Sequence, residues 1–211
     1  MTHEMQIRVL VADDHPIVLE GICSLIRAQP DMAVVGEASN AAHAIELYTS
    51  LQPDVAVLDV SMPGVSGIEA TETICQQVPG ARIVLLTIRE GGYSVRRAIQ
   101  AGALAYILKE SLRSDIIAAI RSAHAGQKYL PERVARSLAD SLSSPDLSSR
   151  ELQVLQLITE ALSNREIASR LNIAEETVKV HVKSILSKLD VRDRAHAGIV
   201  AVRRGIISAE S

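Results

Sequence analysis

Between residues 7 and 125, short apolar runs alternate about five times with stretches of helical periodicity. The expected strands lie near 7–12, 33–37, 55–59, 82–87 and 105–109, and the expected helices near 16–28, 40–51, 66–77, 93–101 and 113–125. Continuous apolar runs of this length are typical of parallel strands that are buried on both faces. Strands that alternate with helices through short loops predict an α/β, doubly wound, five-stranded parallel sheet with right-handed crossovers.

Five polar residues stand where these apolar runs end, namely Asp13, Asp14, Asp59, Thr87 and Lys109. The carboxyl ends of parallel strands share one edge of the sheet, and ligands bind at that edge. We therefore expect the five side chains to converge on one crevice. Three carboxylates at close range raise one another's pKa, and a bound cation would offset that repulsion. The cluster therefore predicts a site for a divalent cation such as Mg²⁺. A lysine and a hydroxyl beside that cation point to a phosphoryl group as the ligand.

Each of these residues has a candidate role. Asp59 is the candidate nucleophile, because an aspartate on a strand-end turn exposes its carboxylate. Asp13 and Asp14 would hold Mg²⁺ together with Asp59, while Lys109 and Thr87 would engage phosphoryl oxygens. Taken singly, the aspartates can be turn or helix-capping residues, and the lysine and threonine can be ordinary strand ends. Those plainer interpretations do not explain why all five positions fall at strand ends.

The last third of the chain shows no strand pattern and indicates four helices. Two capping boxes, Ser148–Glu151 and Ser163–Glu166, begin the first two helices. The third helix is expected over 175–189 and the fourth near 193–204. Two helices joined by a short turn, the second of them rich in lysine, predict a helix-turn-helix.

In the expected recognition helix, apolar residues at helical spacing should face the core, and this leaves Lys179, Val180 and Lys183 pointing outward. The N-terminal part of such a helix reaches base edges in the major groove. Lysine suits guanine edges or phosphates, and valine suits a thymine methyl group. Thr177 and Lys188 are further candidates for contacts to the DNA backbone. The alternative is an amphipathic surface helix with solvated lysines.

These patterns divide the chain into an α/β domain over 1–127, a linker over 128–146 that contains a short helix near 131–142, and an all-helical domain over 147–211. Residues 146–211 carry 10 Lys/Arg and 9 Asp/Glu, a balance too even to indicate nucleic-acid binding by itself. The sequence contains no apolar segment of the kind that forms a signal peptide or spans a bilayer. We therefore expect a cytoplasmic protein with no membrane partner.

Two parts of the chain resemble known domains. Residues 7–125 resemble the receiver domain of bacterial two-component response regulators, through the segments ADDH at 12–15, LDVSMPG at 58–64, Thr87 and YILK at 106–109. Residues 147–206 resemble the LuxR-type DNA-binding domain, through LSSRE at 147–151, LSNREIA at 162–168 and ETVKVHV at 176–182. The whole chain is thus similar to response regulators of the NarL/FixJ family, whose receiver has a flavodoxin-like sheet.

The resemblance implies a mechanism. Asp59 would accept a phosphoryl group from a sensor histidine kinase, and Tyr106 would act with Thr87 as a switch. Phosphorylation would promote a homodimer that binds double-stranded promoter DNA and regulates transcription, with RNA polymerase as a further candidate partner. One departure from the family pattern is Glu110, which follows Lys109 where many receivers have proline.

Two other functions stay open. One is a metal-dependent phosphohydrolase that forms an aspartyl-phosphate; against it, the chain lacks a cap segment to enclose a substrate and devotes residues 147–211 to a DNA-binding pattern. The other is a DNA-binding protein with a degenerate receiver; against it, all five crevice residues are present. We expect no enzyme activity beyond Mg²⁺-dependent self-phosphorylation and self-dephosphorylation of the receiver.

Overall fold

The structure is a computed structural model that describes residues 6–88, 91–142 and 147–207. The chain divides into two compact units, formed by 1–89 with 95–135 and by 90–94 with 136–211. Part of the predicted linker, 143–146, lies outside the described residues.

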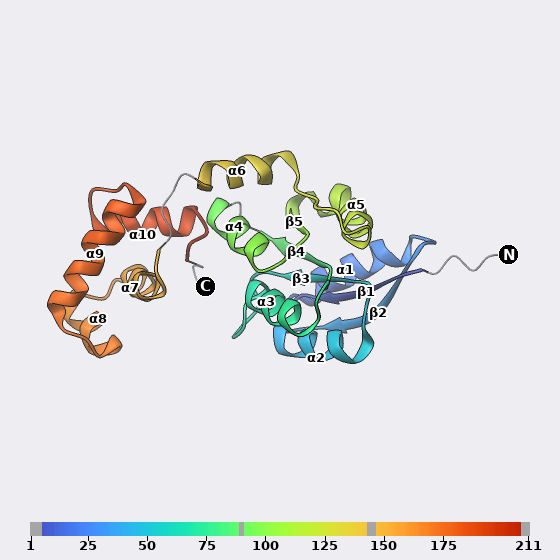
Figure 1. Ribbon diagram of the computed structural model, residues 1–211, viewed down its shortest axis with the longest axis horizontal. Coiled ribbons are helices and arrows are strands. Elements are labelled where there is room, and N and C mark those ends of the chain that lie inside the picture. Colours follow the sequence, from blue (N-terminus) through green and yellow to red (C-terminus); the bar gives the residue numbers. More distant parts are fainter. Residues whose placement is uncertain (1–5, 89–90, 143–146, 208–211) are drawn as a thin grey trace. The chain divides into compact units, whose positions relative to one another are not determined.

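The first unit is the predicted parallel α/β sheet (Figure 1). Its elements are β1 (Ile7–Ala12), α1 (Pro16–Arg27), β2 (Met32–Ala38), α2 (Ala41–Leu51), β3 (Val55–Asp59), α3 (Gly67–Gln77), β4 (Ile83–Thr87), α4 (Gly92–Gln100), β5 (Ala105–Leu108), the 3-10 turn η1 (Lys109–Ser111) and α5 (Leu112–His124). The strands lie in the order β2-β1-β3-β4-β5, and all neighbouring pairs are parallel. The order reverses direction beside β1, and this confirms the doubly wound topology.

Helices cover both faces of this sheet. Helices α1 and α5 pack on one face, and α2 and α3 lie on the other (Figure 1). The α1–α5 face forms one continuous apolar core with alternate residues of the strands. Both faces are buried, which explains why the strands appear in the sequence as continuous apolar runs.

The alternation of side chains along the strands sets the direction of the crevice residues. Asp13, Asp59 and Lys109 each lie two residues beyond a strand residue of the α1–α5 core. Those core residues are Val11, Val57 and Ile107. Side chains two apart on a strand share a face, so the two carboxylates and the ammonium leave the sheet on the same side.

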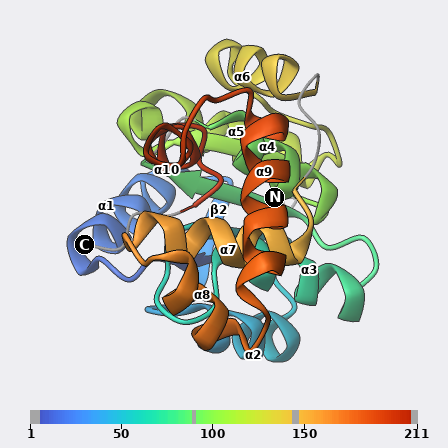
Figure 2. The same ribbon diagram turned by 90° about the vertical axis from the view of Figure 1, so that its left-hand side faces the viewer.

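The second group of elements is helical, as predicted. It comprises α6 (Glu132–Leu142), α7 (Ser149–Thr159), α8 (Asn164–Leu171), α9 (Glu175–Leu189) and α10 (Arg194–Arg203). Both predicted capping boxes are present, Ser148 with Glu151 at α7 and Ser163 with Glu166 at α8. Figure 2 shows α9 lying across α7, with α8 and α10 beside them.

The turn between α8 and α9 completes the helix-turn-helix. Asn172 ends α8 in the left-handed region at φ 51°, where asparagine is tolerated better than most residues. Ala174 precedes α9 and offers no side-chain cap. Glu175 and Glu176 in the first turn instead stabilise the helix start, because their negative charges interact favourably with the helix dipole. Across the described residues, no helix combines the length and the apolar character that a membrane crossing requires.

The start of the predicted linker is tied to the sheet. The backbone N–H of Tyr129 donates to the carbonyl oxygen of Leu104 at 2.9 Å, next to a parallel bridge with Ala105. The Tyr129 hydroxyl lies 3.2 Å from Asp115 of α5. Residue 129 thus covers the outer edge of β5, which would otherwise expose unpaired backbone groups.

Candidate functional site

Two of the predicted carboxylates lie buried at the carboxyl edge of the sheet. Asp13 has no exposed surface, and Asp59 is 1% exposed. The ammonium of Lys109 contacts both: its Nζ lies 2.7 Å from Asp13 Oδ2 and 3.1 Å from Asp59 Oδ1. Residues that follow or end β1, β3 and β5 therefore meet in one crevice, as the strand-end pattern predicts.

The crevice has more buried negative charge than it has positive charge to balance it. Burial raises the pKa of Asp59, the charge of Lys109 partly offsets that effect, and the charge of Asp13 raises the pKa further. Among the described residues, Asp13 Oδ2 and Asp59 Oδ1 share one donor, the Lys109 ammonium, and have no second one. Buried oxygens in this condition indicate a place for a further cation.

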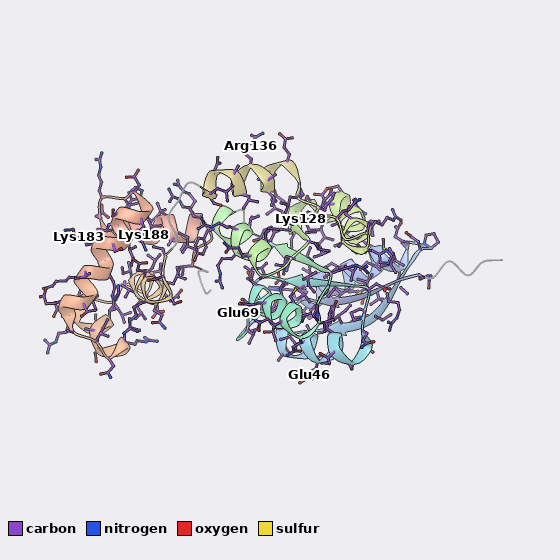
Figure 3. The ribbon with its side chains drawn as sticks, in the orientation of Figure 1. Glu46, Glu69, Lys128, Arg136, Lys183 and Lys188 are labelled. Carbon is purple, nitrogen blue, oxygen red and sulfur yellow. The ribbon has the colours of Figure 1, made fainter. Side chains whose placement is uncertain are left out.

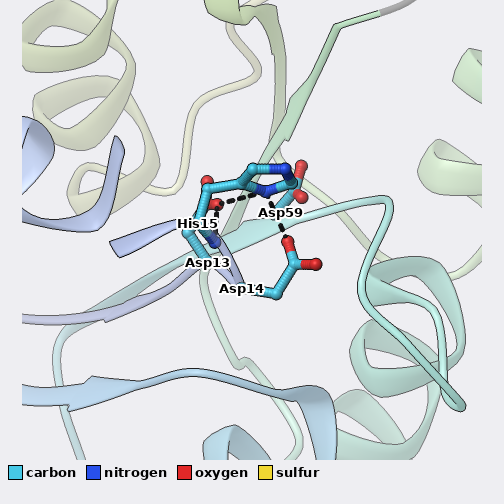
Figure 4. Close-up of side chains that lie close together, drawn as sticks. All are labelled: Asp13, Asp14, His15 and Asp59. Carbon is cyan, nitrogen blue, oxygen red and sulfur yellow. Dashed lines mark hydrogen bonds and ion pairs between the residues drawn. The ribbon is translucent and has the colours of Figure 1, made fainter. Parts of the chain in front are cut away.

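Asp14 and His15 extend the cluster (Figure 4). One donor atom from each of Asp13, Asp14, His15 and Asp59 lies within 4.8 Å of the others. His15 Nδ1 lies 2.8 Å from Asp14 Oδ1, and the His15 backbone N–H donates to Asp13 Oδ1 at 2.9 Å. The three carboxylates fit Mg²⁺, which takes oxygen ligands and retains several waters. His15 is not among the residues predicted for the site, because its place before Pro16 indicates a helix start.

Thr87 and Tyr106 belong to the opposite face of the sheet from Lys109. Their neighbours Leu86, Ala105 and Ile107 point into the α1–α5 core, so alternation directs these two side chains the other way. Tyr106 pairs in register with Leu85, two residues before Thr87. Thr87 is 3% exposed, and Tyr106 is fully buried. The two predicted switch residues are therefore diagonal neighbours on adjacent strands.

Gly67 is a site residue that strand-end reasoning misses. A Cβ atom at this position would lie 2.0 Å from the backbone oxygen of Asp59, which no real contact allows. The Gly67 backbone N–H donates to the carbonyl oxygen of Val60 at 3.0 Å. This close approach closes the loop after β3 and brings α3 against the candidate nucleophile. The dense turn composition of 61–67 is the only sequence signal for it.

Glu110, the departure from the receiver pattern, lies in η1 directly after Lys109. Its carboxylate forms an ion pair with Arg133 of α6. Both side chains are more than half exposed, so this pair contributes little stability. It does not alter the contacts that Lys109 makes with Asp13 and Asp59.

The second candidate surface lies on the first two turns of α9. Thr177, Lys179, Val180 and Lys183 are all exposed, and Val180 keeps 66% of its surface in solvent. Lys179 lies 2.6 Å from Glu176 on the same helix. An exposed valine between two exposed lysines has the composition expected of a helix that enters the major groove.

Lys188 has a different environment. Its ammonium lies 2.7 Å from Oε2 of Glu151, and Glu151 is only 4% exposed. At about 100° per residue, Lys188 stands roughly 180° around α9 from Lys179 and roughly 140° from Lys183. Lys183 and Lys188 are both labelled on α9 in Figure 3. The structure thus separates Lys188 from the other candidate contacts and turns it toward α7.

Comparison with known proteins identifies both units. A family described as "Response regulator receiver domain" matches residues 9–121, and one described as "Bacterial regulatory proteins, luxR family" matches residues 145–201. The transcriptional regulatory protein LiaR of Bacillus subtilis is 41% identical over 96% of this chain and all of its own length. The chain belongs to the NarL/FixJ family of response regulators. Its relatives also include the nitrate/nitrite response regulator NarL of Escherichia coli, 38% identical over 94% of this chain and 96% of its own.

Solved structures agree with this membership. The response regulator ChrA of a heme-sensing two-component system aligns over 96% of this response regulator and 99% of its own chain, with 35% identity and a TM-score of 0.57. The response regulator RcsB, in a complex with DNA, aligns over 94% and 98% of the two chains, with 30% identity and a TM-score of 0.67. The family is thus one of two-component transcriptional regulators that bind DNA.

Proposed function

We propose that this response regulator is switched by transfer of a phosphoryl group from a sensor histidine kinase to Asp59. The observation that carries the proposal is the contact of one ammonium, Lys109, with two buried carboxylates, Asp13 and Asp59, at the carboxyl edge of the sheet. A buried carboxylate beside a fixed cation is placed to form an acyl phosphate. Membership in the receiver family supports a kinase as the donor.

In the proposed transfer, a carboxylate oxygen of Asp59 attacks phosphorus while the bond from phosphorus to the kinase's histidine nitrogen breaks. The bonding electrons leave with the imidazole. The Lys109 ammonium is already within ion-pair distance of Asp59. It can therefore stabilise the negative charge on the phosphoryl oxygens in the transition state without a large movement of its side chain. Mg²⁺, held by Asp13, Asp14 and Asp59, would supply charge neutralisation when bound.

The switch residues support a conformational output. The aspartyl-phosphate at Asp59 carries about −2 of charge where the free carboxylate carries about −1, next to the end of β4 where Thr87 lies. Movement of the Thr87 hydroxyl toward that group would change the packing space of Tyr106, its diagonal neighbour on β5. We infer that this change promotes a homodimer that binds double-stranded promoter DNA, with RNA polymerase as a further partner. Regulation of promoter DNA implies action in the cytoplasm.

For DNA binding, we propose that α9 is the recognition helix. Lys179, Val180 and Lys183 would reach base edges or phosphates, and Thr177 near the helix N-terminus would contact a phosphate. The exposure of these four side chains supports the assignment. The ion pair of Lys188 with Glu151 argues against including Lys188.

The experiment for the receiver is intact-mass measurement after incubation with Mg²⁺ and acetyl phosphate. The wild-type chain should gain one phosphoryl adduct, which should be absent without Mg²⁺ and absent in Asp59→Asn. Asp54→Asn is the matched control. Asp54 stands just before β3, and its carboxylate accepts a hydrogen bond from the backbone N–H of Arg8. The Asp54→Asn variant should therefore still gain the phosphoryl adduct. An adduct that persists in Asp59→Asn would reject Asp59 as the acceptor.

A further inference from the structure

The first turn of α7 forms side-chain contacts with both helices of the helix-turn-helix, α8 and α9. Arg150 and Glu151 are consecutive residues in the first turn of α7, and they reach different helices. The Arg150 guanidinium donates to the carbonyl oxygen of Leu171, the last residue of α8, at 2.9 Å. The Glu151 carboxylate accepts from Ser184 Oγ at 2.6 Å and from Lys188 Nζ at 2.7 Å, and both donors lie on α9.

Glu151 also closes its own capping box. The Ser148 backbone N–H donates to Glu151 Oε2 at 2.6 Å, and the Glu151 backbone N–H donates to Ser148 Oγ at 3.3 Å. One buried carboxylate therefore accepts hydrogen bonds from a backbone N–H at the start of α7, from a hydroxyl and from an ammonium. Such a fully satisfied network has one low-energy geometry, because any shift of α9 along α7 leaves buried polar groups unpaired.

The matching glutamate of α8 provides a contrast within the same chain. Glu166 occupies the same capping-box position and accepts from the backbone and side chain of Ser163. It is exposed, whereas Glu151 is buried between α7 and α9. A helix start needs the interaction that Glu166 makes. The additional contacts of Glu151 with Ser184 and Lys188 exceed what capping requires.

We propose that Glu151 is a positioning residue for DNA recognition, which fixes the register of α9 against α7 through Ser184 and Lys188 and so places Lys179, Val180 and Lys183. Arg150 fixes the end of α8 from the neighbouring position of the same turn. Lys188 in this arrangement is a structural lysine that acts inside the domain. The inference rests on the proposed recognition role of α9.

The test compares two DNA affinities of the full chain. The probes are a duplex obtained by in vitro selection on the wild-type chain and a shuffled duplex of the same length and composition. Glu151→Gln retains the side-chain length and an oxygen acceptor for the cap but removes the charge that holds Lys188. Lys188→Met removes the partner instead. All affinities are measured well below the unfolding temperature of each variant and at equal phosphorylation.

Glu151→Gln should lose roughly ten-fold in affinity for the selected duplex, about the effect of losing one good base contact, and change less than about two-fold on the shuffled duplex. Lys188→Met should give a similar loss, and the double variant should lose no more than either single one, because the two residues act through one contact. The control Glu166→Gln should leave the ratio of the two affinities unchanged.

A ratio that stays at the wild-type value in both Glu151→Gln and Lys188→Met overturns the positioning role. Equal losses on both duplexes overturn it as well, because they indicate a general effect on the fold. If Glu151→Gln does not fold, Lys188→Met decides alone, since Lys188 is 30% exposed at its side chain and leaves the cap intact. The affinities of the double variant Lys179→Ala, Lys183→Ala separate the two proposals: if they are unchanged on both duplexes, the recognition role of α9 is wrong.

Discussion

The ammonium of Lys109 lies 3.1 Å from Asp59 and contacts Asp13 at the same time, so a single positive charge serves two buried carboxylates. The negative charge of the two carboxylates exceeds the positive charge of the one ammonium. Ionised Asp59 is held in an environment that raises its pKa, and this means that the folded state is destabilised when Asp59 carries its charge at neutral pH. Binding of a cation, or a reaction that converts the Asp59 carboxylate into an acyl phosphate, would therefore relieve this unfavourable charge.

This imbalance predicts the response of thermal stability to Mg²⁺. Without Mg²⁺, Asp59→Asn should unfold at a higher temperature than the wild-type chain, by a few degrees or about 1 kcal/mol, because one of two like charges is removed. Added Mg²⁺ should stabilise the wild-type chain more than the variant. Thermal unfolding followed by circular dichroism, with EDTA and with Mg²⁺, measures both effects. Equal responses of the two proteins to Mg²⁺ would remove Asp59 from the metal site.

The packing of Gly67 against Asp59 predicts a second effect. Gly67→Ala would place Cβ 2.0 Å from the Asp59 carbonyl oxygen, so the loop after β3 must shift and carry the nucleophile with it. The variant should lose at least about 2 kcal/mol of unfolding free energy. Its phosphorylation by acetyl phosphate should slow at least roughly ten-fold, the effect of about 1.4 kcal/mol on the barrier. Urea unfolding and the time course of the phosphoryl adduct provide the two measurements.

Gly21→Ala is the matched control for that substitution. Gly21 lies within α1, and a Cβ at this position meets nothing within 4 Å. The change should therefore be neutral or stabilise by up to about 1 kcal/mol, as alanine does in a helix. If both glycine variants are phosphorylated at the wild-type rate, the close approach of Gly67 has no role in placing Asp59.

The sequence predicts the sheet and the meeting of Asp13, Asp59 and Lys109 at its edge, because both follow from local rules. The expected convergence of Thr87 on the same crevice is not seen, because strand alternation directs its side chain to the other face of the sheet. Strand ends are marked by the change from apolar to polar residues, and parallel topology then brings these ends together. Helix starts such as Ser148 and Ser163 are equally local. These features need no knowledge of which side chains touch across the fold.

The remaining features depend on contacts between distant segments, which no local pattern encodes. Lys188 looks like another solvated lysine of α9 until its pairing with Glu151, 37 residues earlier, is seen. Gly67 looks like one turn glycine among several until its distance from the Asp59 backbone is known. His15 looks like a helix start until its ring is found beside Asp14.

The exposed face of α9 predicts how DNA binding depends on salt. Lys179→Ala and Lys183→Ala should each weaken binding, and a lysine that contacts a phosphate should lower the slope of log affinity against log salt by about 0.9. A lysine that contacts a base should instead lower affinity for the selected duplex alone. Fluorescence anisotropy over a salt series distinguishes the two. Lys128, an exposed lysine of the receiver unit, supplies the control Lys128→Ala, which should change neither quantity (Figure 3).

The Glu151 network predicts an acid-sensitive DNA-binding domain. Burial by itself would raise the pKa of Glu151, but hydrogen bonds from Lys188, Ser184 and Ser148 outweigh it and lower the pKa from 4.5 to about 2. Because the folded pKa is depressed, the stabilisation is fully present above the unfolded value of 4.5 and is lost as the pH falls toward 2. The shift corresponds to about 3 kcal/mol.

Urea unfolding of the full chain at several pH values between 7 and 2 tests this, with the wild type compared with Glu151→Gln so that pH effects on the receiver, which both proteins share, cancel. The wild-type chain should lose more stability over this range than Glu151→Gln, and the difference between the two proteins should fall by about 3 kcal/mol toward pH 2. Glu166→Gln should follow the wild-type curve more closely, because Glu166 is exposed and its interactions are confined to its own cap with Ser163. Parallel curves for Glu151→Gln and the wild type would mean that the carboxylate of Glu151 is not held ionised by Lys188 in solution.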